Sequence, residues 1–242
     1  MIRLLFILFP VFGYSQVTIT KVTSSGEHNC SGSALVSVQH NNIPFDAGNL
    51  YIAVVFSDSA TNYGNNIAST SFTWDIVLQI QSHTRRIAIY RCMPTSSTTT
   101  DDPNAVFTFG NFPNNVDFLI YKISGVPLGA NGANAIRQVA VDSASASANP
   151  AISTMTSIPG NAGVMALFIN NSTSFSGTPE GSWTESWDSG CSTFGGATFK
   201  DGTYVDYRVN TNDNTPSVTA ASSDWIGAAI EFRGGRRIII IN

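Results

Sequence analysis

The 242-residue sequence predicts an all-β protein, built as a two-sheet antiparallel β-sandwich with jelly-roll or Greek-key topology. Four observations predict this class. Apolar and polar residues alternate with period two over short runs, and clusters rich in Asn, Gly and Pro separate those runs. The chain also has only 3 Lys and 4 Glu, residues that usually cover exposed helix faces, and no run shows a helical apolar stripe.

The predicted strands begin with a nearly continuous apolar run, 49–56, which is typical of a strand covered on both faces. Trp74 and Trp225 lie inside apolar strands, so we expect both to be buried. The sequence contains neither a linker nor a repeat, and we interpret the Ser-Ala run at 143–150 as a loop or a plain strand. The other predicted strands are 71–80, 85–91, 105–109, 116–123, 136–141, 163–169, 203–209 and 225–232.

Three segments are expected along the chain. Residues 1–15 resemble a signal peptide, because a basic start at Arg3 precedes an apolar run and small residues at Gly13 and Ser15. Residues 16–235 are predicted to form a single β-sandwich domain, and residues 236–242 a C-terminal apolar strand or tail. The early apolar run is too short to cross a bilayer, so we expect a secreted protein, extracellular or at the cell surface, with the periplasm as the alternative.

The C-terminal segment has an unusual composition, two arginines followed by four consecutive isoleucines. Such a segment has high strand propensity, and an exposed copy would be prone to aggregate. Three interpretations stay open: a strand folded back at Gly234–Gly235 into its own sheet, a strand donated to a neighbouring copy, or contact with a membrane surface. Self-association through this strand is therefore one predicted partnership.

Charge and cysteine content limit the other partners. The formal net charge is −4 and charged residues make up 12%, so the basic footprint of a nucleic-acid binder is absent. Cys30, Cys92 and Cys191 follow no zinc-ligand spacing. One disulfide of undetermined pairing and three buried thiols are both compatible with these positions.

No arrangement of catalytic residues is recognisable, so we expect a protein that is not an enzyme. The sequence lacks the Gly-x-Ser-x-Gly elbow of hydrolases and has only three histidines. Its glycine-rich stretches lack the lysine and the following helix of a phosphate-binding loop.

A glycan-binding surface is one candidate site. Sugar rings stack on aromatic faces while carboxylates bind their hydroxyls, and Trp183 and Trp187 flank Glu185 and precede Asp188. On a regular strand two residues four positions apart point to the same side, so the two indoles would share one face. The alternative is that both rings belong to the core.

A calcium site is the second candidate. Asn210, Asn212, Asp213 and Asn214 place oxygen donors close together in one turn, as calcium loops do. The segment lacks the glycine and the bidentate glutamate of the helix–loop–helix calcium motif. Asn-rich turns also form for local backbone reasons. We expect no cofactor other than calcium.

Several short segments together resemble jelly-roll-like domains of phage structural and tail-associated proteins and of bacterial extracellular proteins. The likeness extends over about residues 34–234 and implies a β-sandwich used for assembly or adhesion, with no catalytic residue to transfer. The segments that carry it are 48–55, 72–75, 86–90, 116–121, 179–184 and 223–232.

These observations favour a non-catalytic secreted structural or adhesive module that self-assembles. An extracellular glycan-binding module and a viral, phage-type structural protein are the alternatives, and the sequence leaves a cellular or viral source open.

Overall fold

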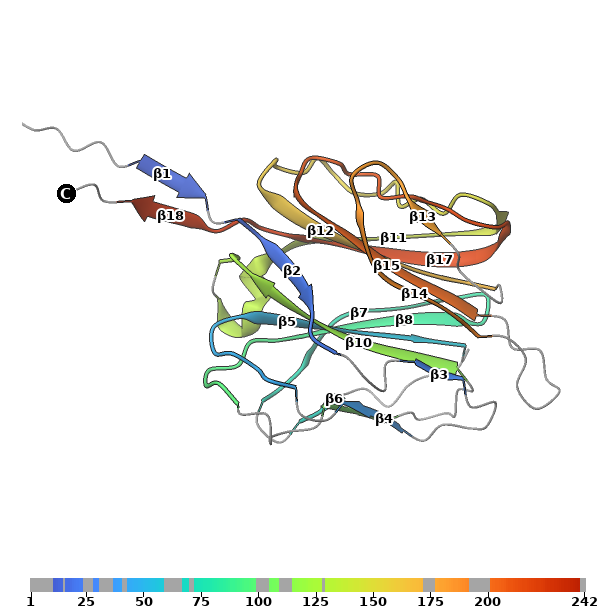
Figure 1. The fold of residues 1–242 in the computed structure, drawn as a ribbon, viewed down its shortest axis with the longest axis horizontal. Helices are drawn as coiled ribbons and strands as arrows, with labels where there is room; N and C mark the ends of the chain where they lie inside the picture. The colour runs from blue at the N-terminus through green and yellow to red at the C-terminus, as the bar shows by residue number, and fades with distance from the viewer. Residues whose placement is uncertain are drawn as a thin grey trace, which may run out of the picture.

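The computed structural model describes residues 11–14, 16–23, 28–30, 37–40, 43–58, 67–69, 72–98, 105–108, 115–127, 129–171, 177–191 and 201–239. Two antiparallel sheets stack face to face, and a two-stranded ribbon projects from one end of the stack (Figure 1). The helical structure in the described residues is one short 3₁₀ segment, η1 (Ala130–Ala135). The predicted all-β sandwich is confirmed.

The first sheet comes from the N-terminal half of the chain, with strand order β2-β10-β5-β8-β7 and β3 also paired to β10. Its strands are β2 (Thr18–Lys21), β3 (His28–Cys30), β5 (Leu50–Ser57), β7 (Asp75–Ser82), β8 (Arg85–Cys92) and β10 (Asn115–Ser124).

The second sheet comes from the C-terminal half, with strand order β11-β17-β12-β15-β14. Its strands are β11 (Ile136–Ser147), β12 (Ala162–Asn170), β14 (Thr184–Cys191), β15 (Asp201–Thr211) and β17 (Ser223–Phe232). The Ser-Ala run at 143–150 therefore lies mostly within β11.

Three smaller sheets complete the described structure, ordered β4-β9-β6, β13-β16 and β1-β18. Their strands are β1 (Val11–Tyr14), β4 (Ser37–His40), β6 (Ile67–Ala68), β9 (Ala105–Thr108), β13 (Thr178–Pro179), β16 (Val218–Thr219) and β18 (Arg236–Ile239).

Both large sheets follow the same path. Without β3, each large sheet has five strands, which can be numbered one to five by their order along the chain. Across both sheets these strands lie in the same spatial order, 1-5-2-4-3. The third strand of each sheet carries one extra residue against the fourth, Val77 in β7 and Ser186 in β14. A buried tryptophan, Trp74 or Trp183, precedes each of these strands. The fold thus repeats a unit that the sequence did not reveal.

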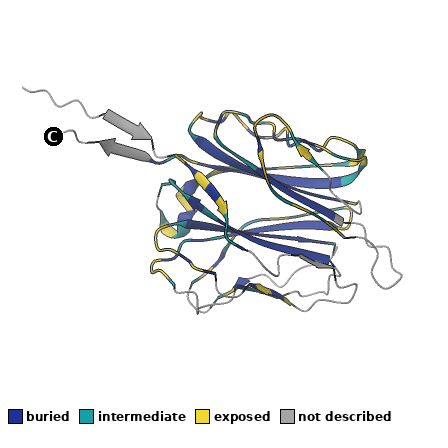
Figure 2. Ribbon diagram, viewed as in Figure 1, coloured by how far each residue is buried: buried dark blue, intermediate teal, exposed yellow. Residues whose placement is uncertain are grey.

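The main core lies between the two sheets. Alternate residues of β5, β8 and β10 meet alternate residues of β12, β15 and β17, and nearly all of them are inaccessible to solvent (Figure 2). Every residue of β5 and of β12 is buried, because both faces of each strand are covered. The inner layer includes Ile52, Val54, Leu119, Leu167, Val205 and Ile230.

The outer face of each sheet has its own apolar cover. The β4-β9-β6 sheet and the segment around Phe45 pack on the first sheet. The segment 150–158 and the β13-β16 pair pack on the second. Trp74 lies in the first of these outer clusters and Trp225 in the second, each 4% exposed, which confirms that they are buried.

The two chain ends of the sandwich meet at Gly125. This residue has a positive φ of 73°, and a Cβ placed on it would lie 2.0 Å from the backbone oxygen of Gln16. The backbone N–H of Gly235 donates a 2.8 Å hydrogen bond to the Gly125 carbonyl. Glycine is therefore required here, where the chain enters β2 and leaves β17.

We predict that Gly125→Ala in the full-length chain lowers the free energy of unfolding by clearly more than Gly48→Ala. Gly48 has a similar φ of 74°, and the space that a Cβ would enter there is open, so its substitution tests the left-handed backbone alone, at about 1–2 kcal/mol. Gly125→Ala adds the clash with Gln16. Urea unfolding measures both free energies. Equal losses in the two variants would contradict the prediction, because they would show that the backbone around Gly125 moves to accommodate the added Cβ.

Candidate functional site

The residues of the predicted glycan site lie on or next to β14, the edge strand of the second sheet. Glu185 pairs with Asp206 of β15, whereas Trp187 pairs with Val205, so Ser186 is an extra, bulged residue. A bulge of one residue reverses the side to which all later residues point. The expectation that Trp183 and Trp187 face the same way is therefore wrong.

Trp183 belongs to the outer apolar cluster of the second sheet and is 6% exposed. Its indole Nε1 donates a 2.9 Å hydrogen bond to Oδ2 of Asp213. A ring buried to this degree does not offer its face to a sugar, and the bond instead fixes the 210–214 turn on the sheet.

Trp187 points the other way, toward the core between the sheets. Its Nε1 donates to Thr203 Oγ1 at 3.1 Å, and the Lys21 ammonium of β2 lies 4.6 Å from its ring centroid. Thr203 and Ser189 both donate to Asp117 of the first sheet, the latter at 2.8 Å. The ring therefore belongs to a polar link that joins the two sheets at the β2–β14 side.

Glu185 and Asp188 both lie on the outer side of β14. They pair with Asp206 and Tyr204, which are two residues apart on β15, so the bulge brings the two acids to successive outward positions. Both side chains are exposed, and neither takes part in an ion pair within the described chain. Although it is exposed, partial burial of its carboxyl and the nearby Glu185 charge raise the pKa of Asp188 to about 6.

The structure therefore brings the two acids together but separates the two indoles. No single surface of the described residues combines Trp183, Trp187 and the acids into a stacking platform, and glycan binding by these residues stays a prediction.

Asp206 is an acid that the sequence analysis did not place at the site. It is fully buried on the outer side of β15, and neither carboxyl oxygen has a hydrogen-bond partner among the described residues. Burial, with smaller contributions from Asp213 and Glu185, raises its pKa to about 8. The sequence signal that could have identified Asp206 is its position as an acid within the predicted strand 203–209.

The amide of Asn170 and the indole N–H of Trp225, also in this sheet, have no hydrogen-bond partner among the described residues. These two residues pair with each other, but Asn170 is four residues along β12 from Ala166, the neighbour of Asp206. Four strand residues span roughly 13 Å. The unpartnered groups therefore do not converge on one ligand.

The predicted calcium turn is held by its own hydrogen bonds. Asp213 Oδ2 accepts from Trp183 and, at 3.2 Å, from Arg208, while Oδ1 accepts from the Thr215 backbone N–H at 3.1 Å. Burial alone would raise the pKa of Asp213, but these hydrogen bonds and the Arg208 charge lower it overall.

The three asparagines of the turn are spread out. Asn210 is exposed with a left-handed φ of 51°, Asn212 lies beyond the end of the β15 pairing, and the Asn214 amide donates to the Met155 carbonyl at 3.2 Å. Across the described residues no group of three or more His, Cys, Asp or Glu side chains is arranged to hold a metal ion. Calcium binding here stays a prediction.

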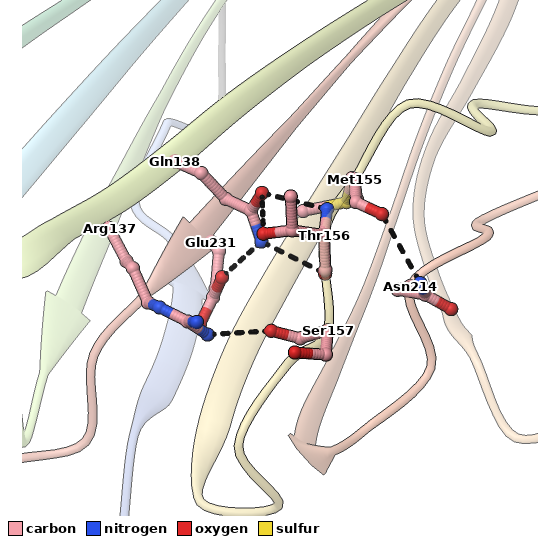
Figure 3. Close-up of polar contacts among 7 residues, drawn as sticks. All are labelled: Arg137, Gln138, Met155, Thr156, Ser157, Asn214 and Glu231. Carbon is pink, nitrogen blue, oxygen red and sulfur yellow. Dashed lines mark hydrogen bonds and ion pairs between the residues drawn. The ribbon is translucent and has the colours of Figure 1, made fainter.

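A separate polar cluster fixes the segment 155–157 to the end of β17 (Figure 3). Glu231 is fully buried, and its carboxylate accepts 2.9 Å and 2.6 Å bonds from Arg137 and Gln138. Arg137 also donates to the Ser157 carbonyl, and Gln138 accepts from the Thr156 backbone N–H. Both carboxylate oxygens are occupied, so this cluster stabilises the cover of the outer core.

Cys92 is a buried free thiol, and burial raises its pKa well above the ordinary value. It therefore forms no disulfide in this structure. The side chains of Cys30 and Cys191 lie outside the described residues, as do residues 1–10 and Ser15 of the predicted signal peptide.

The terminal ribbon is the second candidate site. β18 pairs antiparallel with β1, from Tyr14 opposite Arg236 to Val11 opposite Ile239, and the ribbon extends away from both sheets (Figure 1). Residues 236–239 are thus a strand, but that strand does not pair with the sheet of β17, and residues 240–242 lie outside the described residues. The partner strand of β18 lies within the predicted signal peptide.

Known proteins offer little likeness to this chain. No protein-family model matches it, and no curated protein matches it. Among solved structures, the partial N-terminal region of an enterococcal surface protein is similar at 12% identity, over 97% of this chain and 87% of that chain, with a TM-score of 0.17. A score this low carries no argument about fold or function.

Within the described ranges, no helix has the length and apolarity needed to cross a membrane.

We predict that Asp206→Asn makes the free energy of unfolding less dependent on pH. Between the ordinary value of 3.8 and about 8, the folded chain keeps a proton that the unfolded chain has released. Stability from this group is therefore complete below pH 3.8 and is lost as the pH rises toward 8, by up to about 1.4 kcal/mol per pH unit.

Denaturant unfolding of wild type and variant across this range measures the difference. Glu180→Gln, which removes one carboxyl from an exposed position, supplies the control. An identical slope in Asp206→Asn and wild type would contradict the assignment.

Proposed function

We propose that this protein is a non-catalytic, exported structural module that self-assembles by adding its C-terminal strand to a neighbouring copy. The observation that carries the proposal is the pairing of β18, whose backbone partner is β1 and not a strand of the sandwich. Export rests on the predicted signal peptide.

Removal of residues 1–15 would take β1 away and leave β18 without its strand partner. The sandwich itself would keep its strands, since β2 begins at Thr18 and β17 ends at Phe232. The freed segment carries four consecutive isoleucines, and an unpaired apolar strand gains by joining the edge of another sheet. A second copy of the chain supplies such edges.

The proposal accounts for the separation between the ribbon and the core. A strand that only completed its own sheet would pair with β11 or β14, the two edges of the second sheet. β18 instead leaves the sandwich beyond Gly235 and continues away from it (Figure 1). This position makes the strand accessible to another molecule.

We predict that the chain 16–242 self-associates with rising concentration, whereas the chain 16–235 stays monomeric. At concentrations low enough for both chains to be monomeric, their melting temperatures should differ by no more than about 2 °C. The reason is that β18 pairs with neither sheet of the sandwich. Sedimentation velocity and calorimetry on both chains measure these quantities.

Two results would overturn the proposal. One is a 16–242 chain that remains monomeric at the highest concentration it reaches. The other is a 16–235 chain that loses stability with no change in oligomeric state, as expected if β18 completes its own sandwich.

A further inference from the structure

Strand addition needs an acceptor edge, and this inference rests on the proposed function. In the described chain the large sheets end in five edge strands, β2, β3 and β7 on the first and β11 and β14 on the second, and β3 contains no acidic residue. The acceptor should match the chemistry of β18, which begins with Arg236 and Arg237 and continues with isoleucines.

Charge distinguishes β14 from the other edges. It carries Glu185 and Asp188 and no basic residue, whereas β2 carries Lys21 and β11 carries Arg137 as well as Asp142. On β7 the single acid, Asp75, already contacts Arg91 at 3.6 Å.

The two acids of β14 have no cationic partner among the described residues, in contrast to the acids that form ion pairs. Asp46, Asp213 and Glu231 each form an ion pair with a lysine or arginine of the same chain. Glu185 and Asp188 form none with any described residue, and their mutual repulsion contributes to the raised pKa of Asp188. Two uncompensated acids at successive outward positions form an exposed anionic edge.

We propose that β14 is the acceptor edge, and that β18 of a second copy adds to it as an antiparallel strand with an arginine opposite Glu185 and Asp188. Successive residues of a strand point to opposite sides, so one of the two consecutive arginines faces the acidic side in any register. Opposite charges across a strand pair are favourable.

The same charges prevent the wrong pairing. Two β14 edges brought together would place carboxylates against carboxylates, which is unfavourable, so the edge accepts a basic strand and repels a copy of itself. Each molecule then has one donor strand and one acceptor edge at different places, an arrangement that produces open chains of copies when the operation does not close.

The test uses the 16–242 chain with Glu185→Lys and Asp188→Lys, measured by sedimentation velocity. We expect self-association to weaken by about tenfold or more. The matched control is Asp75→Lys with Asp142→Lys, which changes the net charge equally but on β7 and β11, and it should associate like wild type. High ionic strength should weaken wild-type association, because exposed charges are screened.

A mixing experiment keeps the test decisive. The 16–235 chain offers an acceptor edge without a donor strand. The 16–242 chain with Glu185→Lys and Asp188→Lys offers a donor strand without an acidic edge. Each should be monomeric alone, and an equimolar mixture should form a one-to-one complex only when the donor chain is paired with an acceptor whose Glu185 and Asp188 are intact. If the lysine variant fails to fold, Glu185→Gln with Asp188→Asn takes its place.

The two levels of the proposal fail differently. Association of 16–242 that is unaffected by the changes on β14, or no complex in the mixture, overturns β14 as the acceptor and leaves strand donation standing. A wild-type 16–242 chain that never associates overturns the proposed function itself.

Discussion

Burial of one sheet by the other is the interaction on which the remaining structure depends. Each half of the chain forms one large sheet with an apolar inner face, and neither sheet could expose that face to water and remain stable. Since apolar clusters cover the outer faces as well, the central strands β5 and β12 are buried on both sides.

The two buried acids of the second sheet differ in their hydrogen-bond partners. Glu231 and Asp206 both lie on the outer side of the second sheet, and both are fully buried. Glu231 meets Arg137 and Gln138, so its charge is compensated. Asp206 has no hydrogen-bond partner in the described part of the chain, and burial raises its pKa to about 8.

Much of the fold could be predicted from local patterns. Alternation and apolar runs located most of the long strands but missed β14, and the apolar surroundings of Trp74 and Trp225 identified them as core residues. The bulge at Ser186 could not be predicted, because one inserted residue leaves the composition of the strand unchanged while it reverses the side of Trp187. The candidate site therefore kept its acids and lost its shared aromatic face.

The repeated strand order was hidden for a related reason. Equivalent positions in the two sheets are similarly buried but hold different residue types. Tyr90 and Asp206, for example, each pair with the residue just before the bulge of the neighbouring strand, and both are buried. A comparison of residue types along the chain has no access to that equivalence. The partner of β18 is likewise set by contacts between the two ends of the chain, which local propensity does not specify.

The central claim is that β18 lies outside the cooperative unit formed by the two sheets. Native-state hydrogen exchange of the 16–242 chain tests it directly, because exchange reports the opening free energy of each strand. In dilute monomer the amides of 236–239 should exchange nearly as fast as in a free peptide, while those of β5, β10, β12 and β17 exchange only through global unfolding. Raising the concentration should protect 236–239 selectively. Full protection of 236–239 in the dilute monomer would contradict the account.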